Sequence, residues 1–140
     1  MGGVDLLFHS MTIVVLPFWL PMIFFPNRPW TGRLVASPWI ILPPVLVYTG
    51  LVLANSAALL SIPAHASPAV VAGVLSQPWG GTLFWTHAAA FDLFVGRWIY
   101  LDSRDRGISA LWVSPALVVA VLFGPIGFLM YACVRLTRRS

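Results

Sequence analysis

Long apolar runs separated by short polar segments make up most of this chain. Four of these runs are long enough to be membrane-crossing helices, at about residues 4–25, 38–61, 81–101 and 111–133. A helix needs about 20 apolar residues to cross a hydrocarbon core of about 30 Å. The pattern therefore predicts a single all-α domain over residues 1–140, an integral membrane bundle of four transmembrane helices.

The segments between these runs predict loops and one additional short helix. Residues 26–33 and 102–107 contain arginine and glycine and are expected to be loops outside the membrane. Residues 63–80 are rich in proline, alanine, serine and glycine, and Ser67 followed by Pro68 is typical of a helix start. The apolar side chains that follow share one helical face, which favours a short interfacial helix between the second and third spans.

The fourth apolar run contains residues that disturb a regular helix. Gly124 and Gly127 allow close approach of another backbone, and Pro125 between them is expected to kink the helix. We still expect one crossing over residues 111–133.

The composition agrees with a membrane protein. Hydrophobic residues make up 59% of the chain and charged residues 9%, with a mean hydropathy of +0.90, whereas a soluble domain carries about 25% charged residues. No basic cluster is interleaved with aromatic residues, so a nucleic-acid partner is not expected. We predict a multi-pass integral membrane protein in contact with membrane lipid.

The arginine count does not settle the orientation of a four-span chain. Four spans place both ends of the chain on one side of the membrane. The first and third loops hold four arginines and the C-terminal segment holds three. Because basic residues mark the cytoplasmic side, four against three gives no clear preference.

The third run carries the charged residue that most needs an explanation. Asp92 lies near the centre of the run 81–101, where an ionised side chain costs about 2.5–3.5 kcal/mol on insertion scales. Three interpretations stay open. Asp92 pairs with Arg97, or it is neutral and hydrogen-bonds another helix because burial disfavours the charged form, or it is a functional acid or base.

A helical projection separates the polar residues of this run into two faces. One face carries His87, Phe91, Phe94 and Trp98. Asp92 and Gly96 lie on another face, and His87 and Asp92 are about 140° apart at 100° per residue. They are too far apart for a direct hydrogen bond, but they could flank one groove. Gly96 would let a flat group come close.

Metal and hydrolase sites are not indicated. No pair of histidines or of histidine and acid has the spacing of metal ligands in a helix, so we predict no metal and no cofactor. No nucleophile motif accompanies the histidine and aspartate of the third run.

The charged residues of the third run and the glycines of the fourth together resemble the signature of a known family. The shared positions are His87, Asp92-Leu93-Phe94, Arg97 and Asp102, followed by Phe123-Gly124-Pro125-Ile126-Gly127. This pattern is similar to that of the ABA4-like family, and the resemblance is best over residues 81–131.

The resemblance implies a four-span membrane protein associated with carotenoids. Plant members of the family are needed to convert violaxanthin to neoxanthin, and some homologues are linked to cis–trans isomerisation of carotene. Plant members also carry an organelle-targeting segment, and none is recognised here. The resemblance therefore suggests a bacterial homologue in an inner or photosynthetic membrane.

We accordingly expect a protein that binds a carotenoid or another long isoprenoid and acts in carotenoid or xanthophyll metabolism. The expected chemistry is cis–trans isomerisation or a related acid–base rearrangement, with a neutral Asp92 as the acid and His87 as the base. The expected ligand-binding residues are Phe91, Phe94, Gly96, Arg97, Trp98 and Asp102. The alternative is a non-enzymatic subunit or assembly factor, in a homo-oligomer or a larger pigment–protein complex.

Overall fold

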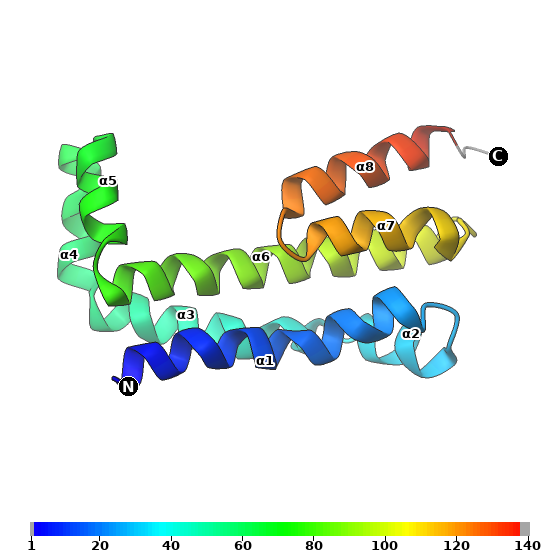
Figure 1. Ribbon diagram of the computed structural model, residues 1–140, viewed down its shortest axis with the longest axis horizontal. Coiled ribbons are helices and arrows are strands. Elements are labelled where there is room, and N and C mark those ends of the chain that lie inside the picture. Colours follow the sequence, from blue (N-terminus) through cyan, green and yellow to red (C-terminus); the bar gives the residue numbers. More distant parts are fainter. Residues whose placement is uncertain (1, 138–140) are drawn as a thin grey trace.

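Two long helices that run side by side form the frame of the molecule. The computed structural model describes residues 2–137, and within them all regular structure is helical, which confirms the all-α prediction. Helix α1 (Gly3–Phe24) has 22 residues and helix α6 (Pro78–Asp105) has 28, and Figure 1 shows them parallel along the long axis. At 1.5 Å per residue, α6 is about 42 Å long.

Four membrane crossings are not confirmed. Within the described residues, α1 is the one single helix that is both long and apolar enough to cross a membrane. A second candidate is the pair Pro29–Ala36 and Pro38–Ala54, which is bent by 69° at its break. One to two such helices support membrane association and do not by themselves establish a multi-pass chain.

The first predicted loop contains a helix. Pro29 occupies the first turn of α2 (Pro29–Ala36), where its missing N–H costs nothing. The chain then bends before Pro38, because a residue that precedes proline avoids the helical region, and Ser37 has ψ of 124°. A short 3-10 helix, η1 (Pro38–Ile41), and α3 (Leu42–Ala54) follow.

The second predicted run ends earlier than expected, at Asn55. The Asn55 side chain donates a hydrogen bond to the Leu51 carbonyl at 2.9 Å, and the helix breaks there. Three short helices follow: α4 (Ser56–Ser61), η2 (Ile62–His65) and α5 (Pro68–Leu75). Helices α4 and α5 lie crosswise to the bundle near the start of α1 (Figure 1).

The short helix predicted between the second and third runs is present. The Ser67 hydroxyl accepts a hydrogen bond from the Val70 backbone N–H at 3.2 Å, and Pro68 is the first helical residue. The crosswise direction of α5 suits a helix that lies along a membrane surface.

The fourth predicted run is divided into two helices, and this differs from the single crossing expected. Helix α7 (Ala110–Ala120) and helix α8 (Gly124–Thr137) form a hairpin whose turn is Val121–Phe123. The turn precedes Pro125, which has no N–H to donate within a helix. The helices are about 16 Å and 21 Å long, so neither reaches across a 30 Å hydrocarbon core.

Glycine explains how closely the hairpin packs. A Cβ atom added at Gly127 would lie 2.5 Å from the Ala120 Cβ atom and 2.7 Å from the Ala116 carbonyl oxygen. The expected close contact with another backbone is therefore present at Gly127, but it joins the two helices of one hairpin and not two separate spans.

The core lies where α1, α6 and the hairpin meet. Its fully buried side chains are Trp19, Met22, Leu93, Ile99, Leu117, Ala120 and Tyr131. Much of the outer surface is also apolar; for example, Ile13 and Leu53 are each 70% exposed. Such a surface is unusual for a protein in water and agrees with membrane association.

Candidate functional site

An apolar pocket lies beside the middle of α6, at the tip of the α7–α8 hairpin. Its volume is about 170 Å³. Its lining residues come from α1, α6 and the hairpin turn: Thr12, Val15, Leu16, Trp19, Phe84, Trp85, Ala88, Ala89, Asp92, Val121 and Leu122. Asp92 is the charged residue in this lining. We call this space the Asp92 pocket.

Asp92 also contacts the first residue of α8. The Gly124 backbone hydrogen-bonds the Asp92 carboxylate, and a Cβ atom at Gly124 would overlap the Asp92 Oδ1 atom. The first N–H groups of a helix have no partner within it, and α8 has no acidic residue in its own first turn. Asp92 of α6 therefore stabilises the start of α8 across the hairpin tip.

Arg97 is not the partner of Asp92. Its Nε donates to the Val35 carbonyl at 2.8 Å and its Nη2 donates to the Ala36 carbonyl at 2.7 Å. These carbonyls end α2, where no further turn of helix satisfies them. Arg97 thus holds the end of α2 against α6.

The space beside Gly96 is occupied by an aromatic side chain of the protein itself. A Cβ atom at Gly96 would overlap the Cη2 and Cζ3 atoms of Trp19, and Trp19 is 1% exposed. The flat group that Gly96 admits in this structure is the Trp19 indole, which in turn forms one wall of the Asp92 pocket.

His87 lies outside the Asp92 pocket. Its ring is stacked on Phe91, with centroids 4.7 Å apart, and lies 5.4 Å from the Tyr48 ring of α3. The side chain is exposed. The two groups assigned to acid and base thus face different surfaces, as their separation of about 140° on α6 implies.

The aromatic residues expected to line a groove do not line the Asp92 pocket. Phe91 and Phe94 are 59% and 51% exposed on the outer surface. Trp98 packs against α8, with its ring centroid 5.4 Å from that of Phe128 and 5.7 Å from that of Tyr131. Phe94, Trp98 and Phe128 border a separate, shallow depression.

Asp102, just beyond the run 81–101, joins α6 to α8 through a group of polar contacts. Its carboxylate accepts a hydrogen bond from the Tyr131 hydroxyl at 2.6 Å and one from Arg106 Nε at 3.0 Å. Arg135 Nε forms an ion pair with it at 3.1 Å. Burial raises the pKa of Asp102, but these hydrogen bonds and the two arginine charges outweigh burial, and the pKa lies below its usual value.

Helix α1 supplies pocket residues that the sequence reasoning did not identify. Thr12, Val15 and Trp19 have the spacing of one helical face, so their common orientation was readable. Their position opposite Asp92 could not be predicted, because it depends on how α1 packs on α6.

The buried Trp85 Nε1 has no hydrogen-bond partner among the described residues, although its ring lines the pocket and stacks on Phe8 at 5.4 Å.

The described residues contain no group of three or more His, Cys, Asp or Glu side chains placed to hold a metal ion.

In comparisons with known proteins, the family model ABA4-like, described as ABA DEFICIENT 4-like, matches residues 6–131. The match covers the Asp92 pocket and, of the Asp102 contacts, Arg106 and Tyr131 but not Arg135. No curated protein and no solved structure matches the chain significantly.

Proposed function

Because the chain belongs to the ABA4-like family, we propose that it binds a carotenoid in the Asp92 pocket and isomerises it between cis and trans forms. Family membership supports a role in carotenoid or xanthophyll metabolism. The observation that carries the finer proposal is the pocket itself, in which one carboxyl group lies among apolar and aromatic side chains.

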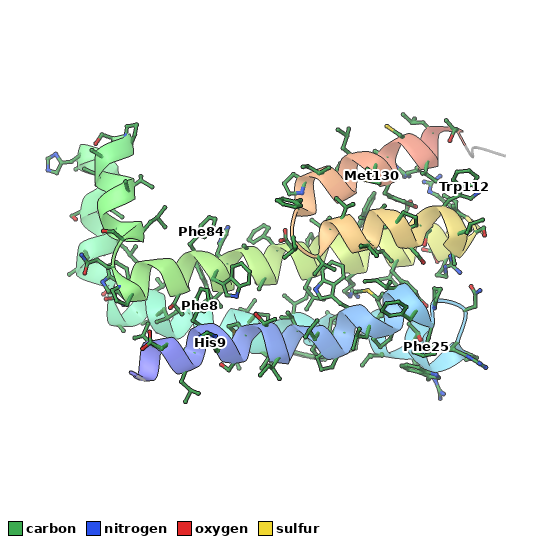
Figure 2. All side chains as sticks on the ribbon, viewed as in Figure 1. Phe8, His9, Phe25, Phe84, Trp112 and Met130 are labelled. Atoms are coloured by element: carbon green, nitrogen blue, oxygen red, sulfur yellow. The ribbon has the colours of Figure 1, made fainter. Side chains whose placement is uncertain are left out.

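The size and rim of the pocket fit part of a long apolar ligand. A cavity of about 150 Å³ is enough for one benzene ring, so 170 Å³ admits a ring or a short stretch of polyene. Leu16, Phe84 and Leu122 line the pocket and are 38%, 57% and 64% exposed. The remainder of a carotenoid would lie along this exposed apolar surface, where Figure 2 shows Phe84 on the part of α6 that the hairpin does not reach.

A single acid is sufficient for the isomerisation. A protonated Asp92 gives its proton to one carbon of the polyene, and the neighbouring double bond becomes a single bond with the positive charge spread over the conjugated chain. The bond rotates, and the same carboxylate takes the proton back, so no oxidant or second base is consumed. The Trp19 and Trp85 rings line the site, and aromatic rings attract positive charge. His87 has no step in this scheme.

Asp92→Asn tests the chemical step. Asparagine can still accept the hydrogen bond from Gly124, so the variant is expected to fold and retain pigment while losing isomerisation. The measurement is the isomer profile of carotenoids from a producing host, together with the pigment bound to purified protein. Asp105→Asn is the matched control, because Asp105 is exposed at the end of α6. Wild-type isomerisation by Asp92→Asn would contradict the acid role.

The non-enzymatic alternative also has an observation in its favour. The contact between Asp92 and Gly124 already gives the carboxylate a structural role at the start of α8. A subunit or assembly factor of a pigment–protein complex would retain pigment without changing its isomer profile, in the wild type as well as in Asp92→Asn. That result would favour the alternative.

The binding step is tested separately by filling the pocket. Ala88 lines the pocket on α6, and Ala88→Leu should reduce the amount of carotenoid that copurifies with the protein. Ala72→Leu, at an exposed position of α5, controls for a larger apolar surface. If Ala88→Leu binds as much pigment as the wild type, the ligand does not occupy this pocket.

A further inference from the structure

Apart from Arg97, the arginines that the structure describes lie together at one end of the bundle, the end at which α6 finishes. They come from three separate parts of the chain, namely α2 with the residue before it, the end of α6 and the end of α8: Arg28, Arg33, Arg104, Arg106 and Arg135. We call this the arginine end. Arg138 and Arg139 lie outside the described residues.

Hydrogen bonds and an ion pair join the three parts. Arg104 Nη1 donates to Asn27 Oδ1 at 2.8 Å, which links the end of α6 to the turn before α2. The Tyr100 hydroxyl donates to the Pro26 carbonyl, also at 2.8 Å. Arg135 pairs with Asp102 at 3.1 Å, which links the end of α8 to the end of α6.

The hairpin is the reason why the end of α8 is found here. Helix α7 starts at the arginine end and runs back along α6, and α8 returns in the opposite direction (Figure 1). The turn between them reaches only the middle of α6, where Val121 and Leu122 line the Asp92 pocket. Non-helical backbone at membrane depth is tolerated where it lines a cavity or is buried in protein.

Helix α6 can cross a membrane although it carries charged residues. Asp92 has the Gly124 backbone as its partner, and Arg97 has two backbone carbonyls of α2. Neither side chain needs water, and the cost of an ionisable side chain in the membrane falls when protein groups satisfy it. Helix α1 lies beside α6, and the continuous segment Pro38–Ala54, formed by η1 and α3, packs along it. At 2.0 Å per 3-10 residue and 1.5 Å per α-helical residue this segment is about 28 Å long, so it is the third element of the length that a crossing needs.

We infer that the chain crosses the membrane three times, with α7–α8 as a re-entrant hairpin and the arginine end against anionic lipid headgroups on the cytoplasmic side. The start of α1 and the end of α8 then lie on opposite sides of the membrane. Four crossings would place them on the same side.

The charge distribution supports this orientation. Arg28 and Arg33 are exposed, and their side chains make no hydrogen bond or ion pair with the described residues, so both guanidinium groups are free to meet lipid phosphates. Basic residues remain on the cytoplasmic side, where anionic lipid headgroups attract arginine side chains. The opposite end has no arginine among its described residues and carries Asp5, His9 and His65.

Aromatic side chains at the arginine end mark a membrane interface. Phe25 and Trp30 are 50% and 45% exposed and lie in contact, with ring centroids 6.1 Å apart. Trp112, at the start of α7, lies toward the same end as Phe25, whereas His9 lies toward the other (Figure 2). Tryptophan is enriched where the hydrocarbon core meets the headgroups.

Single-cysteine labelling tests the number of crossings. Cys133 is the one cysteine of the chain, so Cys133→Ser gives a cysteine-free background. Ala66→Cys, Asp105→Cys and Thr137→Cys are then added one at a time, all at exposed positions. A membrane-impermeant maleimide is applied to right-side-out and to inverted membrane vesicles from the expressing cells.

The expected result is that Asp105→Cys and Thr137→Cys label in inverted vesicles, and Ala66→Cys in right-side-out vesicles. If Thr137→Cys labels from the same side as Ala66→Cys, the chain crosses four times and the inference is overturned. If Asp105→Cys and Thr137→Cys label together but from the outside, the proposed orientation is wrong.

A double variant tests the role of the arginines. Arg28→Gln with Arg33→Gln removes two charges that make no internal contact, so folding should be unaffected. A fraction of the Thr137→Cys protein should now label from the outside. Unchanged labelling would show that contact of these arginines with anionic headgroups does not set the orientation.

Discussion

Trp19 packs closely against α6 because residue 96 has no side chain. A glycine in the interior of a helix costs about 0.5–1 kcal/mol relative to alanine, and here the space it leaves is taken by a fully buried indole. The same indole forms a wall of the Asp92 pocket. Gly96 therefore fixes both the packing of α1 on α6 and the shape of the candidate site.

We expect Gly96→Ala to destabilise the protein by about 1–3 kcal/mol, because the added methyl group overlaps Trp19 and overpacking costs this much. Thermal unfolding in detergent measures the effect. Gly50→Ala in α3 is the control, since its Cβ atom would meet nothing within 4 Å and the change should stabilise the helix slightly. Equal stability of the two variants would show that Trp19 is not held against residue 96.

Asp102 gives a prediction about pH. Its pKa in the folded protein lies below its usual value of 3.8, so its stabilising contribution is complete above that value and is lost as the pH falls through the lower, folded pKa. Thermal unfolding of the wild type should therefore shift to lower temperature below about pH 4, and Asp102→Asn should lack this component. An identical pH dependence in both proteins would contradict the role of Asp102.

Single residues also show what a sequence can reveal about a site. A lone carboxylate is costly in a membrane, so the sequence leaves three interpretations of Asp92 open, and the contact with the Gly124 backbone agrees with the one in which Asp92 hydrogen-bonds another helix. The partners of Arg97 were not predictable, since Val35 and Ala36 are more than 60 positions away in sequence. Backbone carbonyls at a helix end leave no mark in the pattern of side chains.

At the scale of elements, the α7–α8 hairpin is the main departure from the expected fold. The turn residues Val121, Leu122 and Phe123 are as apolar as the helices around them. Hydropathy alone therefore predicts one continuous span over residues 111–133. Pro125 and the two glycines indicated a disturbance, and we expected a kink. Whether a helix kinks or reverses depends on the surface that the second half can pack against, which here is the first half.

Gly127→Ala should open or destabilise the hairpin. The new Cβ atom would lie 2.5 Å from the Ala120 Cβ atom and 2.7 Å from a backbone oxygen, and backbone cannot move aside as a flexible side chain can. We expect a loss of about 1–3 kcal/mol and faster hydrogen exchange in α8. Gly73→Ala in α5 has open space around it and serves as the control. Unchanged exchange in α8 would be evidence against this packing.

Arg97→Lys tests how the end of α2 is held. Lysine keeps the charge but lacks the planar group that reaches the Val35 and Ala36 carbonyls together. Hydrogen bonds from charged groups contribute about 1.5–3 kcal/mol, so loss of one bond should lower stability by about that amount. Arg33→Lys, at an exposed residue of α2, should not change the stability. Equal stability of both variants would show that Arg97 does not cap α2.

At the scale of the whole molecule, composition and hydropathy identified the class of protein and left its arrangement open. A chain with 9% charged residues and apolar side chains on its outer surface is suited to lipid. The number of crossings is a different kind of property. It depends on breaks at Asn55 and Val121–Phe123, each of which is decided by local hydrogen bonds and tertiary contacts.

The exposed rim of the Asp92 pocket has a consequence for kinetics. Leu16, Phe84 and Leu122 are on the outer apolar surface, so under the proposed function a carotenoid dissolved in the bilayer would reach the pocket by lateral diffusion, without passing through water. The rate should then follow the mole fraction of carotenoid in the membrane and not its amount per volume of solution. Adding pigment-free lipid to proteoliposomes at constant total carotenoid should slow turnover by surface dilution.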